Sequence, residues 1–94
     1  MAPSAVADLD EIWLYVARDA SIDIAERLIE TIIRIFPLLA ANPGMGLLRP
    51  NLGAGIRSFS VSNYRVYYRQ DGGGRRRILH IRHAARDEKK LGRR

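Results

Sequence analysis

The sequence of 94 residues contains no cysteine, only two histidines, only two lysines and no long apolar run. The lack of cysteine excludes disulfide bonds and thiolate metal sites, and it is typical of a chain from a reducing cytoplasm. Two histidines are too few for a structural zinc site, so we expect neither a metal nor another cofactor. The apolar run at residues 32–41 contains Arg34 and is too short to cross a bilayer, so we predict no membrane segment. The acidic start of the chain predicts no export signal.

The charge of the chain is divided between its two halves. Residues 1–43 hold seven acidic residues and three arginines, a net charge of −4. Residues 44–94 hold thirteen basic and three acidic residues, a net charge of +10. A half this basic attracts nucleic acid or an acidic protein partner. The length predicts one domain over residues 1–94, with residues 1–3 as a lead-in and residues 88–94 as a flexible basic tail.

Two amphipathic helices are predicted in the first half. Apolar residues at helical spacing place the first helix at residues 4–18, with Ser4 as its N-cap. Ser21 is expected to cap a second helix, whose apolar stripe runs to the stop signal at residues 42–44. Pro37 is expected to kink that helix or to tighten its last turn. A connection this short predicts an antiparallel helical hairpin with one apolar face to bury.

The second half reads as a small antiparallel sheet. Residues 44–55 contain four glycines and Pro50, so we expect a loop without regular structure. Residues 56–61 predict a strand, and Ser62-Asn63 predicts the turn after it. Residues 64–87 then predict a β-hairpin around the glycine-rich turn at residues 71–74.

Alternation along that hairpin sorts its side chains into two faces. Leu79 and Ile81 are expected on the core face of the return strand, and Ile78, His80 and Arg82 on the other face. The predicted fold class is therefore α+β, with the helical hairpin packed on a small antiparallel sheet.

Four segments resemble, in order, the signatures of a known toxin family. They are residues 7–13, ADLDEIW; residues 42–46, NPGMG; residues 55–59, GIRSF, followed by residues 64–69, YRVYYR; and residues 83–87, HAARD. Together they cover nearly the whole chain and resemble the ParE toxins of the RelE/ParE superfamily, from bacterial type II toxin–antitoxin modules. This resemblance implies the element order β-α-α-β-β-β. Residues 1–3 are too few to form the first strand, so we expect a sheet that lacks it and has an exposed edge.

The resemblance also implies partners. It implies a ParD-like antitoxin that neutralises the toxin, DNA gyrase as the target, growth arrest as the outcome and a cytoplasmic location, with no sequence-specific binding of nucleic acid. We assign target binding to Arg57, Arg65, Arg69, Arg82, His83 and Arg86. We assign antitoxin binding to Trp13, Arg49 and Tyr67, although Trp13 also suits a partly exposed core position and Arg49 a simple connector.

The same superfamily contains RelE-like ribosome-dependent mRNA endonucleases, so the fold class does not decide between inhibitor and enzyme. Arg65 and Arg86 match the two arginines of those enzymes. The lysines that would precede the strands and the tyrosine that would follow Arg86 are missing. We therefore expect no catalytic residue, with an endonuclease using Arg65, Arg86 and His83 as the alternative. A further alternative is a relic that still binds an antitoxin but is no longer toxic.

Overall fold

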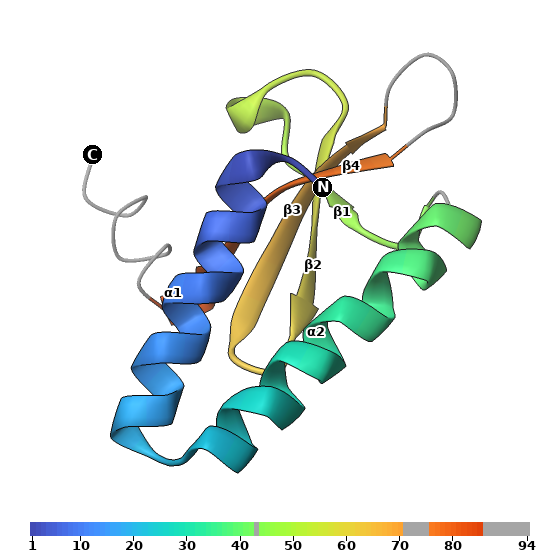
Figure 1. Ribbon diagram of the computed structural model, residues 1–94. Helices are drawn as coiled ribbons and strands as arrows, with labels where there is room; N and C mark the ends of the chain where they lie inside the picture. The colour runs from blue at the N-terminus through green and yellow to red at the C-terminus, as the bar shows by residue number, and fades with distance from the viewer. Residues whose placement is uncertain (43, 71–75, 86–94) are drawn as a thin grey trace.

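The computed structural model describes residues 1–42, 44–70 and 76–85. Two helices, α1 (Pro3–Asp19) and α2 (Ile22–Ala41), run in opposite directions in front of a four-stranded antiparallel sheet (Figure 1). The strands follow the order β1-β2-β3-β4 and are β1 (Leu47–Leu48), β2 (Ile56–Val61), β3 (Tyr64–Gln70) and β4 (Arg76–His83). The predicted α+β fold is confirmed. The glycine-rich turn at residues 71–74 lies outside the described residues.

Helix α1 begins one residue earlier than predicted. Its N-cap is Ala2, which makes no side-chain capping bond, and Pro3 occupies the first turn. Proline suits that position because its fixed φ angle is helical and its missing N–H would have no partner there. The prediction that Ser4 caps the helix is therefore wrong. The Ser4 hydroxyl instead donates to the carbonyl oxygen of Leu79 at 2.7 Å.

Helix α2 begins and ends as predicted. The Ser21 hydroxyl accepts a hydrogen bond from the backbone N–H of Ile24 at 3.1 Å and caps the helix, which confirms that assignment. The helix continues through Pro37 to Ala41 and ends at Asn42. The Asn42 side chain donates to the carbonyl of Leu38 and satisfies one of the terminal acceptors.

The segment at residues 44–55 is more ordered than the sequence suggested. Its β1 strand pairs with β2, and a 3-10 helix, η1 (Pro50–Leu52), follows. A strand of two residues is too short to show any alternation, so no sequence pattern could reveal it. Gly46 packs closely against the Tyr68 side chain and leaves no room for a side chain of its own. A Cβ atom at this position would clash with the Tyr68 hydroxyl and lie 2.9 Å from the Ser58 carbonyl oxygen.

Strand β4 contains an irregularity that changes its core residues. Tyr67 pairs with His80 and Tyr68 pairs with Ile78, so Leu79 is the extra residue of a β-bulge. Ile78 and Ile81 are both buried, at 6% and 3% exposure, whereas Leu79 is only half-buried. The prediction that Leu79 faces the core and Ile78 faces away is therefore wrong. A bulge shifts the alternation by one residue beyond the point where it occurs.

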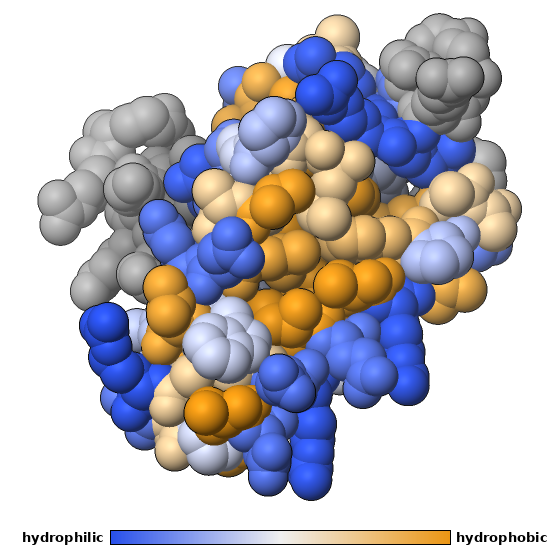
Figure 2. All heavy atoms as spheres, viewed as in Figure 1, coloured by the Kyte–Doolittle hydropathy of each residue, from blue (hydrophilic) through white to orange (hydrophobic). Residues whose placement is uncertain are grey.

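The core lies between the helices and one face of the sheet. It joins Leu9 and Ile12 of α1, Ile32 and Leu39 of α2, and a set of strand residues that alternate toward the helices. Those strand residues are Val61, Tyr64, Val66, Tyr68, Ile78 and Ile81. The two helices diverge from their connection, and apolar side chains gather between them on the molecular surface (Figures 1 and 2).

The first turns of α1 cover part of the outer edge of β4. The Ala2 N–H donates to the Ile78 carbonyl at 2.9 Å, and Ser4 bonds to Leu79. The Asp8 carboxylate accepts from the Ile81 N–H at 3.0 Å. The sheet edge that we expected to be exposed is thus partly covered by a helix, which is one way in which proteins protect edge strands.

In the described parts of the chain, neither helix has the length and apolar content that crossing a bilayer requires.

Candidate functional site

Four arginines of β3 and β4 lie on the sheet face opposite the helices. They are Arg65, Arg69, Arg77 and Arg82, and we call this surface the arginine face. The register places Arg65 opposite Arg82 and Arg69 opposite Arg77. In the described ranges, all seven carboxylates belong to α1 and α2, and the strands have none. The arginine face therefore attracts a partner with an anionic surface.

The four side chains differ in accessibility. Arg65 is only 8% exposed, Arg82 is half-buried, and Arg69 and Arg77 are exposed. Arg65 is therefore not the solvated strand-face charge that the alternation alone would suggest. The accessible positive charge of this face therefore lies where Arg69 of β3 pairs with Arg77 of β4.

A polar chain connects α1 to the arginine face. The Nδ1 atom of His80 lies 3.1 Å from the Asp8 carboxylate and 3.3 Å from a terminal nitrogen of Arg82. Nδ1 either donates to the carboxylate or accepts from the guanidinium, because one ring nitrogen cannot do both at once. Asp8 also binds the Ile81 N–H, so this carboxylate holds the helix, the strand and the histidine together.

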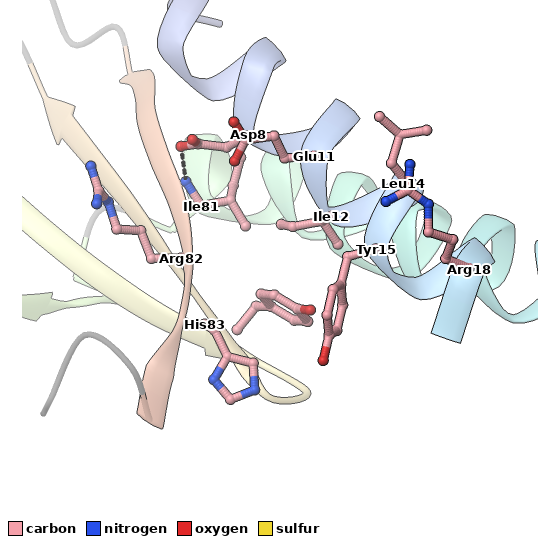
Figure 3. Close-up of a pocket in the computed structure, with 10 residues that line it drawn as sticks. Asp8, Glu11, Ile12, Leu14, Tyr15, Arg18, Ile81, Arg82 and His83 are labelled. Carbon is pink, nitrogen blue, oxygen red and sulfur yellow. Dashed lines mark hydrogen bonds between the residues drawn. The ribbon is translucent and has the colours of Figure 1, made fainter. Parts of the chain in front are cut away.

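A cleft of about 480 Å³ opens between α1 and the end of β4 (Figure 3). We call it the α1–β4 cleft. One wall carries side chains of α1, and the other carries Tyr64 of β3 with the end of β4. Its polar and aromatic lining residues are Asp8, Glu11, Tyr15, Arg18, Tyr64, Arg82 and His83. The volume falls within the range of sites that take a small ligand or a side chain of a partner.

His83, the last residue of β4, lines this cleft. Its ring packs edge-on against Tyr64, with the ring centres 5.3 Å apart and an angle of 81° between the planes. The His83 Nδ1 atom is buried and, within the described ranges, makes no hydrogen bond. A buried polar atom without a partner costs free energy, so the position of the His83 ring is held by its packing and not by a hydrogen bond of Nδ1. Figure 3 shows His83 directed toward α1 and Arg82 directed away from it.

The structure brings together only some of the predicted target-binding residues. Arg65, Arg69 and Arg82 share the arginine face, whereas His83 faces the helix side in the α1–β4 cleft. Arg57 also lies on the helix side, because it pairs with Tyr68, and it donates to the Gly46 carbonyl at 2.7 Å. Arg86 lies outside the described residues.

The three residues assigned to antitoxin binding do not form one surface. Trp13 lines a groove between the two helices. Arg49 lies at the other edge of the sheet, where its Nε donates to the Ser58 hydroxyl at 2.8 Å. Tyr67 is buried on the sheet, at 6% exposure, and offers a partner little surface.

Sequence reasoning missed the α1 wall of the α1–β4 cleft. Asp8, Glu11, Tyr15 and Arg18 recur at three- and four-residue intervals, which places them on one helical stripe. That stripe was the available signal, since it carries an exposed tyrosine and both signs of charge directly beside the apolar residues of α1.

Among residues 1–42, 44–70 and 76–85, no group of three or more histidine, aspartate and glutamate side chains is placed to hold a metal ion.

Comparison with known proteins shows that the chain is similar to ParE toxins. A family described as the ParE toxin of the type II toxin–antitoxin system parDE matches residues 1–88. Toxin ParE1 of Mycobacterium tuberculosis is 28% identical over 87 residues, which cover 93% of this chain and 89% of that protein. Toxin ParE1 of Caulobacter vibrioides is 33% identical over 79 residues, which cover 84% of this chain and 80% of that protein.

A solved structure described as a chromosomal ParDE TA system from P. aeruginosa shares the fold, with a TM-score of 0.73 and 26% sequence identity. The similarity covers 87% of this chain and 89% of that one.

Proposed function

The chain belongs to the ParE toxin family of type II toxin–antitoxin systems, and from this premise we propose that it arrests growth by binding DNA gyrase. We propose further that a ParD-like antitoxin neutralises it, that it acts in the cytoplasm and that it has no catalytic centre of its own.

The arginine face is the observation that carries the target-binding part of this proposal. It concentrates four guanidinium groups on two adjacent strands, while the described carboxylates all lie on the helices. Such a separation of charge directs the arginine face of the sheet, and not the two helices, toward an anionic surface of the target. The α1–β4 cleft adjoins this face through Arg82 and offers the exposed ring of Tyr15 to a side chain of the target.

The register supports binding in preference to RNA cleavage. An endonuclease that used Arg65 and His83 would need both side chains near one scissile phosphate. Arg65 pairs with Arg82, the immediate neighbour of His83, so alternation directs Arg65 and His83 to opposite faces of the sheet. The third residue of that alternative, Arg86, lies outside the described residues.

Gyrase supercoiling, measured beside ribosome-dependent mRNA cleavage on one protein preparation, tests the proposal. We expect the chain to inhibit supercoiling and to leave mRNA intact. The variant Arg69→Glu/Arg77→Glu should inhibit supercoiling at least about tenfold less well, because two exposed charges that face the target are reversed. The variant Arg27→Glu/Arg34→Glu is the matched control, since both are exposed arginines of α2 away from the arginine face and their reversal changes the net charge equally.

The outcomes separate the alternatives. Cleaved mRNA with unaffected gyrase would replace the proposal with the endonuclease alternative. A folded protein that bound an antitoxin but affected neither substrate would identify a relic. Equal loss of inhibition in the Arg27→Glu/Arg34→Glu control would show that net charge, and not the arginine face, carries target binding.

A further inference from the structure

The arginine face exposes charge but little apolar surface. Tyr67 stands between Arg65 and Arg69 on this face, and the register adds Ile56 opposite Arg69. Both apolar side chains are buried, Tyr67 at 6% and Ile56 at 8% exposure. The register also places the exposed Leu47 on this face, but Leu47 belongs to the edge strand β1, two strands away from β3. A partner that approaches the described part of β3 and β4 from this side therefore meets mainly guanidinium groups.

This composition suits a nucleic-acid backbone better than a protein. Protein interfaces draw much of their affinity from apolar and aromatic side chains that become buried at the centre of the contact. Interfaces with DNA are much more positively charged, and roughly half to two-thirds of their hydrogen bonds go to phosphate and sugar. Arginine is well suited to phosphate because its planar guanidinium group donates two parallel hydrogen bonds.

The arrangement of the arginines supports a polyanionic ligand. Arg65 lies opposite Arg82, and Arg69 lies opposite Arg77. Like charges directly opposite each other on neighbouring strands destabilise a sheet, and phosphate groups beside them would reduce that cost. The two pairs are four residues apart along β3, which is about 13 Å at the rise of a strand. Each strand of DNA carries a phosphate about every 3.4 Å along the axis, so a duplex that crosses both pairs presents about four phosphates of one strand to this surface.

Arg49 extends the same surface toward the edge of the sheet. Its Nε donates to the Ser58 hydroxyl at 2.8 Å, and Ser58 shares the face because it pairs with Tyr67. Gly53 lies against Arg69, since a Cβ atom there would be 3.4 Å from a guanidinium nitrogen of Arg69. The arginines of this surface that are exposed or half-buried are therefore Arg49, Arg69, Arg77 and Arg82.

The burial of Tyr67 favours double-stranded over single-stranded nucleic acid. Proteins that bind single strands stack the unpaired bases on accessible aromatic rings. Tyr67 is buried, and the neighbouring ring of His80 is half-buried and contacts Asp8 and Arg82. The described residues of the arginine face therefore offer little ring surface for stacking, which suits a duplex whose bases are already paired.

We propose that the arginine face binds the phosphate backbone of duplex DNA without regard to its sequence. Phosphate groups are alike at every step of the duplex, so the order of the bases has no effect on these contacts. The inference rests on the proposed function, because it identifies the anionic surface that this face meets at gyrase as the DNA bound to that enzyme. The α1–β4 cleft, with the exposed ring of Tyr15, is then left for the protein surface of the target.

DNA binding by the full chain alone, without gyrase, tests the inference. A fluorescein-labelled duplex two helical turns long is titrated with the chain, and its anisotropy is followed between about 50 and 200 mM salt. About four neutralised phosphates predict a slope of about −3.6 for the logarithm of the binding constant against that of the salt concentration. Arg69→Gln/Arg77→Gln should bring the slope to about −1.8 and weaken binding at the lowest salt at least about tenfold. A second duplex of unrelated sequence should bind equally well.

Two comparisons locate the site and identify its ligand. Arg27→Gln/Arg34→Gln is the matched control, because it removes the same charge from exposed positions of α2 and should keep the slope of the unchanged chain. One strand of the duplex, tested alone, should bind more weakly than the duplex because its charge density is lower. An unchanged slope in Arg69→Gln/Arg77→Gln would assign the binding to basic residues elsewhere in the chain and would overturn the inference. Tighter binding of the single strand, or of an RNA duplex, would overturn it as well.

The supercoiling assay on the same variants separates this inference from the proposed function. A chain that inhibited supercoiling through Arg69 and Arg77 but bound no DNA would show that the face meets a protein surface, which would overturn the inference and leave the proposed function standing. A chain that bound DNA through the arginine face but left gyrase unaffected would refute the proposed function and support the DNA site. All four substituted positions are exposed, so each variant should keep a Tm close to that of the unchanged chain.

Discussion

Replacing Asp8 by alanine removes two contacts that hold α1 against β4. The Asp8 carboxylate accepts a hydrogen bond from the Ile81 N–H at 3.0 Å and lies 3.1 Å from the His80 ring nitrogen. In the alanine variant, the Ile81 N–H loses its acceptor at the edge of the sheet. The Asn variant keeps a side-chain oxygen that can accept from Ile81, so it isolates the effect of the charge.

The expected loss follows from the two contacts. A hydrogen bond to a charged group contributes about 1.5–3 kcal/mol, and the partly exposed Asp8–His80 contact adds at most about 1 kcal/mol. Asp8 is 23% exposed and His80 is 39% exposed, so water compensates part of both losses. We expect Asp8→Ala to lower the free energy of unfolding by about 2 kcal/mol and Asp8→Asn by about 1 kcal/mol. For a domain of this size, 2 kcal/mol corresponds to a fall of about 8–16 °C in Tm.

Urea denaturation followed by Trp13 fluorescence measures these losses, and amide hydrogen exchange at Ile81 shows where they arise. Asp10→Ala is the matched control, because Asp10 is an exposed carboxylate of the same helix. Exchange at Ile81 should accelerate in Asp8→Ala and stay unchanged in Asp10→Ala. If the two alanine variants were equally stable within about 0.5 kcal/mol, Asp8 would not hold α1 against β4.

Two other substitutions test the packing of the sheet. Gly46→Ala should destabilise the protein by about 1–3 kcal/mol, because the new methyl group would clash with Tyr68, whereas Gly44→Ala has open space and should change stability by less than about 0.5 kcal/mol in the same urea assay. Ile81→Ala should lower the free energy of unfolding by about 2–5 kcal/mol, because it leaves a cavity in the core. Leu79→Ala should lower it by less than half as much, and an equal loss in the two variants would contradict the bulge.

The sequence was most informative where a pattern repeats. Helical spacing and the Ser21 cap predicted the hairpin, and alternation bounded by turn residues predicted β2 at its observed limits. The two-residue β1 was missed because it is too short to alternate. The bulge at Leu79 was missed because nothing local marks it, and the shifted alternation then misplaced both Ile78 and Leu79.

The site was predictable where its residues belong to a repeating pattern. Alternation along β4 predicted that Arg82 faces away from the core, and the register places Arg65 and Arg69 on the same face. The position of Arg57 was also within reach, because a two-residue turn at Ser62-Asn63 fixes the register and pairs Arg57 with Tyr68. The groups opposite β4 on α1 were not predictable, because tertiary packing alone brings residues 8 and 81 together.

The contact between Asp8 and Ile81 spans 73 positions of the chain, and it has a consequence for synthesis on the ribosome. Translation adds about 5–20 residues per second, so about 4–15 s pass between the making of the two partners. During that interval α1 can pack against α2 but not against β4, so the core that its apolar stripe enters still lacks Ile78 and Ile81. Completion of the sheet is therefore a late event in the synthesis of each molecule, and a nascent chain interrupted before β4 lacks both the arginine pairs and the α1–β4 cleft.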